Sequence, residues 1–392
     1  MLPLQGITVV SLEQAVAAPF ATRQLADLGA RVIKIERPGT GDFARDYDKT
    51  VLGQSSHFVW LNRSKESLTL DVKHAQAAEI LHRLLARADV FVQNLVPGAA
   101  ARLGLASETL LECYPRIVVC NISGYGPDGP YSRKKAYDLL IQCESGLLSV
   151  TGTPETAAKA GISIADIAAG MYGYSGVLTA LYRRERTGKG SAFEVSMFEA
   201  LGEWMGYPAY FTHYGGTPPP RTGAAHATIH PYGPFAASDG KSVFFGIQNE
   251  REWVNFCATA LEQPGVASDP RFNSSSQRTA NREPLTQIIH GVFANLPAAQ
   301  VIERLERAQI ANARLNTMQE FWQHEQLEAR GRWREVATPR GPIEALLPPV
   351  TMQGVEPRMD PIPALGEHTR SILAELGFDQ GFIAGLERDG AI

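Results

Sequence analysis

The order of apolar and polar positions in the first half of the chain predicts strands and helices in alternation. Short runs rich in β-branched residues predict strands over 7–12, 31–36, 89–93 and 117–122. Apolar positions with a 3.6-residue period predict helices over 17–28 and 75–88. This order favours an α/β architecture with a parallel, doubly wound sheet.

The pattern changes near residue 206. Residues 215–223 are rich in glycine and proline, which is typical of a linker. Residues 232–247 then predict a hairpin that turns at Asp239-Gly240, and the pattern over 250–307 is largely helical. We therefore predict a large Rossmann-like domain over 1–205, a linker over 206–225, a small α+β domain over 226–325, and a second linker and C-terminal segment over 326–392.

Parallel strands place their carboxyl ends along one edge of the sheet, where open α/β sheets bind ligands. The first turn contains no G-x-G-x-x-G sequence, so a nicotinamide or flavin site is not expected. Several basic residues follow predicted strands or precede helices, among them Arg37, Lys73, Arg102 and Lys135. Each alone is most simply a solvated surface charge. Together they would suit a polyanionic ligand such as a nucleotide with several phosphates.

Asp166 lies between an apolar, strand-like stretch that begins at Gly161 and a helical pattern that runs from Ala168 to about Arg186. The simplest interpretation is that Asp166 caps the helix. The positive end of a helix also keeps a carboxylate ionised, and an ionised, oriented carboxylate can act as a nucleophile. Local sequence leaves both interpretations open.

Composition narrows the class of protein. The formal net charge of −4 gives no sign of nucleic-acid binding, and no apolar run approaches the length of a membrane span. The four cysteines lack C-x-x-C spacing, and the histidines at 213, 226 and 230 have no carboxylate cluster beside them, so no metal site is expected. These features fit a cytoplasmic enzyme with no nucleic-acid or membrane partner.

Six short segments, taken together, resemble the class III CoA-transferases, the CaiB/BaiF family. The matching segments are Gly29-Ala-Arg-Val-Ile-Lys-Ile-Glu36, Asn62-Arg-Ser-Lys65, Asn94-Leu-Val-Pro97-Gly98, Ser123-Gly-Tyr-Gly126, Arg186-Thr-Gly188-Lys-Gly190 and Leu365-Gly-Glu-His-Thr369. The resemblance implies an interlocked homodimer in which each C-terminal segment returns to its large domain. It also implies that a CoA thioester is a substrate and that no cofactor is bound permanently.

The resemblance assigns a role to Asp166 as the family's catalytic aspartate, which attacks the acyl-CoA thioester and forms a mixed anhydride. It implies that the acyl group lies against Gln14, Ala15, Val16 and Ala17. The residues at or near its CoA-contacting positions are Arg37, Lys73, Asn94, Leu95, Arg102, Lys135 and Tyr137.

The family also contains 2-methylacyl-CoA racemases, in which a histidine stands at the position of Tyr137. A phenol with a pKa near 10 is a poor base at neutral pH, so Tyr137 favours a transferase over a racemase or epimerase. A non-catalytic acyl-CoA-binding paralogue is a third alternative, against which the presence of Asp166 and Tyr137 argues.

The chain looks closest to the shorter family members that act on C4–C5 dicarboxylates. The resemblance of the segment from Ala224 to Tyr232 to these members implies itaconate or mesaconate as acceptor, with succinyl-CoA as donor. The acceptor's second carboxylate would need a cationic or donating partner, and the candidates are Arg45, His226 and His230. Oxalate-type members of the family carry a glycine-run loop over the active site, whereas the corresponding stretch 245–253 has a single glycine here. Either the lid has a different chemistry, or the loop over 212–232 is the lid.

Overall fold

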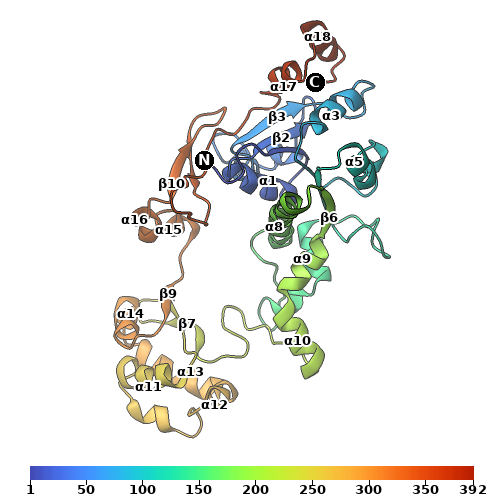
Figure 1. Cartoon of the computed structure of the whole chain (residues 1–392). Coiled ribbons are helices and arrows are strands. Elements are labelled where there is room, and N and C mark those ends of the chain that lie inside the picture. The colour runs from blue at the N-terminus through green and yellow to red at the C-terminus, as the bar shows by residue number, and fades with distance from the viewer. The chain divides into compact units, whose positions relative to one another are not determined.

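A six-stranded parallel sheet carries the candidate site, as the alternating pattern predicted. The computed structural model describes all residues from Met1 to Ile392 (Figure 1). The strands lie in the order β3-β2-β1-β4-β5-β6, and every neighbouring pair is parallel. Their bounds are β1 (Thr8–Leu12), β2 (Arg31–Glu36), β3 (Lys65–Thr69), β4 (Val90–Gln93), β5 (Val118–Ser123) and β6 (Ser191–Ser196). The winding direction reverses between β1 and β4, which marks the switch point at which such sheets bind ligands.

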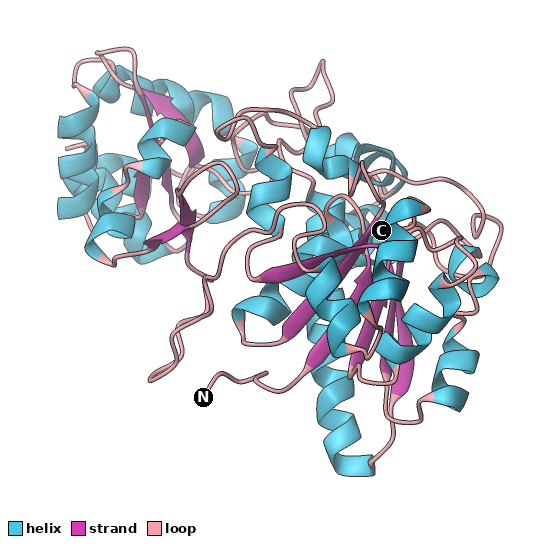
Figure 2. Ribbon diagram, turned by 90° about the horizontal axis from the view of Figure 1, so that it is seen from above, coloured by secondary structure: helices cyan, strands magenta, loops and turns pink.

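Helices cover both faces of this sheet (Figure 2). Alternate strand residues face opposite sides, so Val9 and Val90 pack with α1 and α8, whereas Val10 and Phe91 pack with α3, α17 and α18. The helices around the sheet are α1 (Ala17–Asp27), α2 (Ser56–Leu61), α3 (Ala77–Leu85), α4 (Ala99–Arg102), α5 (Ser107–Cys113), α6 (Asp138–Glu144), α8 (Ile164–Thr187), α9 (Met197–Trp204), α17 (Thr369–Glu375) and α18 (Gln380–Arg388), with the 3₁₀ turn η1 (Phe43–Asp46).

The chain divides into two units. Unit 1 contains residues 1–145, 160–206 and 326–392, and unit 2 contains residues 146–159 and 207–325. The predicted hairpin is present in unit 2, where β7 (Tyr232–Ala236) and β8 (Ser242–Gly246) are antiparallel and β9 (Asn312–Arg314) joins them. The other elements that lie wholly within unit 2 are α7 (Leu147–Val150), α11 (Glu250–Asn255), η2 (Phe256–Ala260), η3 (Pro264–Ser268), α12 (Ser275–Ala280), α13 (Arg282–Phe293), α14 (Ala298–Arg307) and α15 (Met318–Trp322).

Two sequence predictions were wrong in detail. Residues 206–215, expected to begin a linker, form helix α10 (Gly206–Gly215). The stretch before Asp166, expected to resemble a strand, consists of a bend followed by the first residues of α8. Ile162 is exposed there, so its apolar side chain does not belong to a buried strand. No helix is both long and apolar enough to cross a membrane.

The C-terminal part of the chain packs on unit 1. It contains α16 (Glu325–Ala329) and a hairpin of β10 (Trp333–Val336) and β11 (Ile343–Leu346). The N–H of His368 then donates to Ser67 O at 3.0 Å, and the N–H of Thr69 donates to Thr369 Oγ1 at 2.9 Å. These bonds fix α17 beside the edge strand β3.

A buried group of charged side chains lies under the loop that follows β1. It contains three carboxylates and three cations, so its formal charges cancel, and its members are Glu13, Lys34, Glu36, Asp42, Arg45 and Lys65. We call this set the buried charge cluster. Lys34 Nζ lies 2.6 Å from Asp42 Oδ2 and 3.6 Å from Glu13 Oε1, and Lys65 Nζ lies 2.7 Å from Glu13 Oε1. Buried ions are tolerated only when paired in this way.

Replacing Lys34 by Met is expected to destabilise the fold by about 3–5 kcal/mol, because Asp42 would remain buried without its counter-ion. The shift of the urea-unfolding midpoint of unit 1 measures this loss. The matched control is Lys49→Met, since Lys49 pairs with Asp46 at the exposed surface and its loss should barely move the midpoint. Equal shifts in the two variants would contradict the role given to the buried charge cluster.

Candidate functional site

The loop after β1 is tied to the loop after β4, across the switch point of the sheet. The N–H of Gln14 donates to Asn94 Oδ1, and Asn94 Nδ2 donates back to Gln14 O, both at 2.9 Å. This reciprocal pair uses both backbone groups of Gln14. The Gln14 backbone is therefore fixed, and its side chain remains available at the carboxyl edge of the sheet.

Ala15 has a left-handed backbone with a φ of 62°, which is unfavourable for a residue other than glycine. Its N–H donates to Asp42 Oδ1 at 3.1 Å, and Asp42 is held in turn by Lys34. The same Asp42 Oδ1 accepts the N–H of Ala44 at 2.9 Å. The buried charge cluster thus stabilises a strained loop conformation, as is common where a site must be held in one geometry.

Helix α1 begins directly after this loop without a side-chain cap. Val16 occupies the N-cap position and makes no side-chain hydrogen bond. The backbone N–H groups of Val16, Ala17 and Ala18 have no acceptor in the chain. Free N–H groups at a helix N-terminus attract negative charge, so this turn can stabilise an oxyanion.

Asp166 is the third residue of α8, so the N-cap interpretation was wrong. Ser163 occupies the N-cap position, and Asp138, from the start of α6, caps the helix instead. Asp138 Oδ1 accepts the N–H of Ala165 at 2.7 Å and the N–H of Asp166 at 3.3 Å. Asp138 Oδ2 is fixed by Gln142 Nε2 at 2.6 Å. The carboxylate of Asp166 is therefore not used for capping.

Helices α1 and α8 run in the same direction where they pack together. The Cα of Gly170 faces the Ala17 carbonyl and Phe20, and the Cα of Gly173 faces Ala21. Asp166 lies one turn before Gly170 on the same face of α8. By this register, its carboxylate lies at the level of the Gln14–Val16 loop and the free N–H groups of α1.

Burial raises the pKa of Asp166 to about 7, and the nearby negative charge of Asp138 adds to the rise. No hydrogen-bond donor of the chain reaches this carboxylate. The expectation that the helix N-terminus keeps Asp166 fully ionised is thus wrong for the chain by itself, because desolvation outweighs the helix dipole. An elevated pKa makes the ionised carboxylate a stronger nucleophile, although a smaller fraction is ionised at neutral pH.

Sequence reasoning missed Tyr47, which follows η1. Burial raises the pKa of Tyr47 to about 12, and the charges of Asp42, Asp166 and Tyr137 contribute to the shift. Tyr47 therefore remains a neutral hydrogen-bond donor beside these residues. Its ring packs against His57 at 5.3 Å and Phe43 at 5.7 Å. No local motif marks it, because a half-buried tyrosine in a loop has no distinctive sequence pattern.

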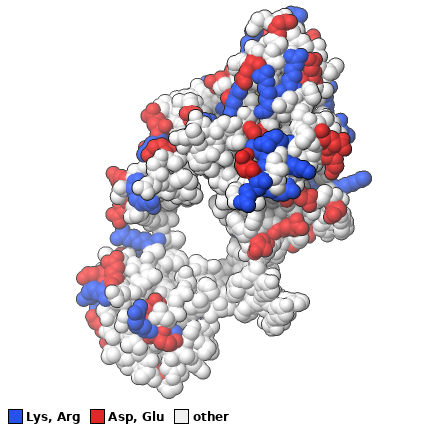
Figure 3. All heavy atoms as spheres, in the orientation of Figure 1, with Lys and Arg blue, Asp and Glu red and all other residues white.

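The residues assigned to CoA lie in unit 1, on loops and, for Arg102, at the end of α4. Asn94 and Leu95 follow β4 directly, and the N–H of Leu95 donates to Gln93 Oε1 at 2.7 Å. Tyr137 is exposed and occupies the N-cap position of α6. The four cations in this set are exposed and make no ion pair or side-chain hydrogen bond within the chain, and they are Arg37, Lys73, Arg102 and Lys135. Lys and Arg side chains are interspersed with carboxylates over the face in Figure 3.

Two of the three candidate partners for the acceptor's second carboxylate offer no free cation. Arg45 is already engaged, because its Nε and Nη2 bind Glu36 at 2.8 and 2.7 Å. This pairing, with Lys34 and Ser67, overcomes the effect of burial and holds the pKa of Glu36 at about 2. His230 is buried in unit 2, and burial, with Arg282 and Arg278 nearby, lowers its pKa to about 4. His230 is therefore neutral at pH 7, so neither residue offers a free cation.

His226 lies in the same loop of unit 2 as His230. Its Nδ1 accepts the N–H groups of Thr228 and Ile229 at 3.2 and 3.1 Å, and its ring stacks on Tyr232 at 5.2 Å. A ring nitrogen that accepts two N–H groups carries no proton. The proton of neutral His226 is therefore on Nε2, which is left as a donor.

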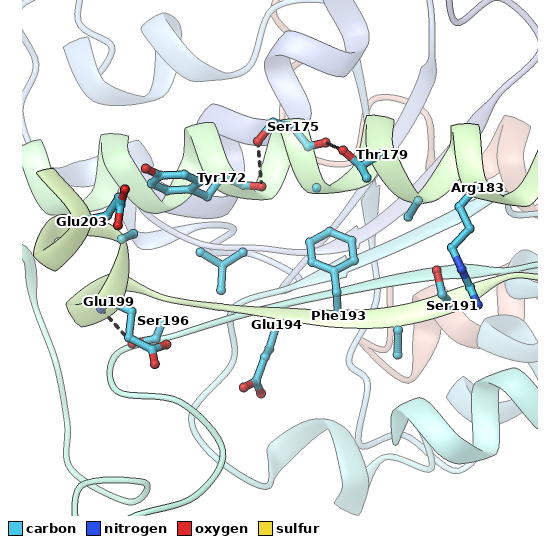
Figure 4. Close-up of a pocket in the computed structure, with 15 residues that line it drawn as sticks. Tyr172, Ser175, Thr179, Arg183, Ser191, Phe193, Glu194, Ser196, Glu199 and Glu203 are labelled. Atoms are coloured by element: carbon cyan, nitrogen blue, oxygen red, sulfur yellow. Dashed lines mark hydrogen bonds between the residues drawn. The ribbon is translucent and has the colours of Figure 1, made fainter.

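A groove of about 880 Å³ lies between α8 and the edge strand β6 (Figure 4). Its lining includes Tyr172, Arg183, Phe193 and Glu203, and it contains none of the residues predicted for the site. No group of three or more His, Cys, Asp or Glu side chains is arranged to hold a metal ion. This groove therefore does not coincide with the candidate site around Asp166.

Comparisons with known proteins show which family the chain resembles. Residues 4–369 match the profile of CoA-transferase family III. The chain is similar to the succinyl-CoA:glutarate CoA-transferase of Mus musculus, with 33% identity over 398 residues that cover 100% of this chain and 91% of that protein. It is also similar to a succinate–glutarate CoA-transferase of Agrobacterium fabrum, with 30% identity over 95% of this chain and 96% of that protein.

A solved structure of the same family also matches this chain. A crystal structure of a CAIB/BAIF family protein from Brucella suis is 31% identical in sequence and has a TM-score of 0.83. The match covers 96% of this chain and 99% of that chain. The likeness therefore extends over both units rather than over the parallel sheet alone.

Replacing Asp166 by Asn is expected to stabilise the protein at pH 8.5 more than at pH 5. The folded state holds this proton up to about pH 7, whereas an unfolded aspartate releases it near 3.8. The stability of the natural protein therefore falls as pH rises between these values, and Asn removes that loss. Thermal midpoints of both proteins over this pH range measure the difference. A difference independent of pH would show that the pKa of Asp166 is not raised.

Proposed function

Because the chain belongs to CoA-transferase family III, we propose that it moves CoA from an acyl-CoA to a free dicarboxylic acid with Asp166 as the nucleophile. One observation carries the assignment to Asp166. Asp166 lies in the first turn of α8, on the face that packs against α1. No cation and no hydrogen-bond donor of the chain pairs with its carboxylate. A partly buried carboxylate without a partner is costly to fold, so a chemical role accounts for its presence.

The reaction proceeds through four exchanges in which atoms and charges balance. One Oδ of ionised Asp166 attacks the thioester carbonyl, the C–S bond breaks, and a mixed anhydride and CoA thiolate result. The thiolate attacks the aspartyl carbonyl and releases the donor acid, which leaves an aspartyl-CoA thioester. The acceptor carboxylate then attacks this thioester to give a second anhydride and thiolate. Attack of the thiolate on the acceptor carbonyl forms the new acyl-CoA and regenerates Asp166.

Each exchange passes through a tetrahedral intermediate with a negative oxygen. The free N–H groups of Val16, Ala17 and Ala18 supply donors for that oxygen. Tyr47 remains a neutral phenol at all working pH values and supplies a further donor. No base is needed, because a carboxylate attacks without losing a proton. The activity therefore depends on the ionised fraction of Asp166, which rises as pH passes about 7.

We propose succinyl-CoA as the donor and a five-carbon diacid as the acceptor. The names of the Mus musculus and Agrobacterium fabrum relatives support glutarate, and the segment from Ala224 to Tyr232 supports itaconate. Of the three residues considered for the acceptor's second carboxylate, His226 is the best supported. Its Nε2 is a donor that no group of the chain occupies, whereas Arg45 is paired and His230 is buried and neutral.

We further propose that the protein works as a homodimer, which family resemblance implies to be interlocked. Helix α10 supports an association of this kind. Its aromatic side chains are more exposed than is usual for a monomer, with 69% of Tyr210 and 78% of Tyr214 accessible. A second copy of the chain would cover this surface.

The proposed transfer is tested with succinyl-CoA and a panel of glutarate, itaconate, mesaconate, malate and butyrate, with new thioesters identified by mass spectrometry. We expect glutaryl- or itaconyl-CoA to form, and butyrate, which lacks a second carboxylate, to be a poor acceptor. Asp166→Asn should abolish transfer, and borohydride should mark Asp166 during turnover. Glu185→Gln is the matched control, because Glu185 lies exposed on the same helix. Failure to form any new thioester, or retained turnover in Asp166→Asn, would contradict the proposal.

Replacing Arg37 or Arg102 by Ala is expected to raise the KM for succinyl-CoA roughly tenfold or more, with the KM for the diacid unchanged. Both cations are exposed and unpaired, and a charged hydrogen bond to phosphate contributes about 1.5–3 kcal/mol. Arg388→Ala, at an exposed position in α18, serves as the control. An unchanged KM for succinyl-CoA in both variants would remove these residues from the CoA site.

A further inference from the structure

Helices α1 and α8 meet at one point with no side chain between them. A Cβ atom on Gly170 would stand 2.7 Å from the carbonyl oxygen of Ala17 and 3.0 Å from Cδ1 of Phe20. The first distance is too short for any real contact, and its partner is a backbone atom that cannot move unless α1 moves. Glycine inside a helix is less favourable than alanine, so Gly170 lowers the stability of α8.

This contact lies between the two halves of the candidate site. Asp166 is four residues before Gly170 on the same face of α8. Ala17 directly follows the Gln14–Val16 loop, and its own N–H is one of the three free donors at the start of α1. The separation of the helices at Gly170 therefore sets the distance between the carboxylate of Asp166 and those donors.

The two other glycines along this part of α8 differ in what they contact. A Cβ on Gly173 would meet the flexible δ-methyl of Ile122 at 3.0 Å and Ala21 Cβ at 3.5 Å. A Cβ on Gly176 would meet the ring of Phe193 on β6 at 2.4 Å, away from α1. Among these three glycines, the backbone of α1 is in the way only at Gly170.

We propose that Gly170 is a positioning residue for the transfer reaction. Its lack of a side chain holds α8 against α1 at the separation where the Asp166 carboxylate and the N–H groups of residues 16–18 act on one carbonyl. This inference rests on the proposed function, because it assigns a purpose to the distance between a nucleophile and its oxyanion donors. A displacement of about 1 Å between such groups lowers a rate by roughly 100-fold.

The test is Gly170→Ala, with Gly173→Ala as the matched control on the same helix. We expect kcat to fall about 10- to 100-fold in Gly170→Ala while the KM for succinyl-CoA stays near its original value. The cations assigned to CoA lie on segments other than α1 and α8, so CoA binding should not change. Gly173→Ala should keep kcat, because the end of Ile122 can yield. A purely structural role would alter thermal stability and leave kcat of the folded variant intact.

A second variant covers the case in which Gly170→Ala does not fold. Phe20→Trp enlarges the ring that lies against Gly170, and it should cause the same selective loss of kcat. A folded Gly170→Ala protein with the original kcat would overturn the proposal. So would an unfolded Gly170→Ala protein together with a Phe20→Trp protein of original kcat.

Trapping of the covalent intermediate separates this inference from the proposed function. Absence of an aspartyl thioester in the natural protein would overturn the proposed function itself. If the natural protein forms the intermediate and Gly170→Ala forms it at the same rate, only the role of Gly170 is lost. Slower formation in Gly170→Ala, with formation in Gly173→Ala unchanged, is the expected result.

Discussion

The candidate site depends on the neutral balance of charge beneath the loop after β1. Asp42 connects the buried charge cluster to this loop, because one of its oxygens accepts the N–H of Ala15 and the other binds Lys34. Lys34 and Lys65 in turn share Glu13, whose second oxygen accepts the hydroxyl of Thr22 on α1. One set of buried ion pairs thus fixes the loop and the helix that follows it. The site is built on bonds that water cannot easily replace.

A second constraint acts on the nucleophile. Asp166 would be an ordinary first-turn acid if a residue of α8 capped the helix. The cap comes instead from Asp138, whose negative charge also raises the pKa of Asp166. Capping and activation are therefore performed by one carboxylate. The close crossing of α8 over α1 then brings the carboxylate to the free N–H groups of α1.

The sequence predicted the helices and strands well and the contacts between distant residues poorly. The bounds of β2 were predicted to the residue, because Arg31–Glu36 is a continuous run between a glycine and a proline-containing turn. The start of α8 was placed too late, because Ile162 and Ile164 suggested a strand. Residue Asp166 was found through family resemblance, since its local pattern suited a simple cap equally well.

The contacts that decide the geometry of the site join residues far apart in the chain. Ala15 and Asp42 are 27 residues apart, and Ala165 and Asp138 are also 27 residues apart. No local pattern reveals such pairs, and alanine gives no sign of a left-handed backbone. Arg45 was considered free for the same reason, although the structure pairs it with Glu36. The order of chain growth also matters, because Asp71 donates its N–H to the carbonyl of Ala391, the next-to-last residue. The edge strand β3 is likewise bonded to α17, 300 residues later in the chain, so this edge stays uncovered during synthesis until α17 has formed, and an uncovered strand edge can pair with other chains.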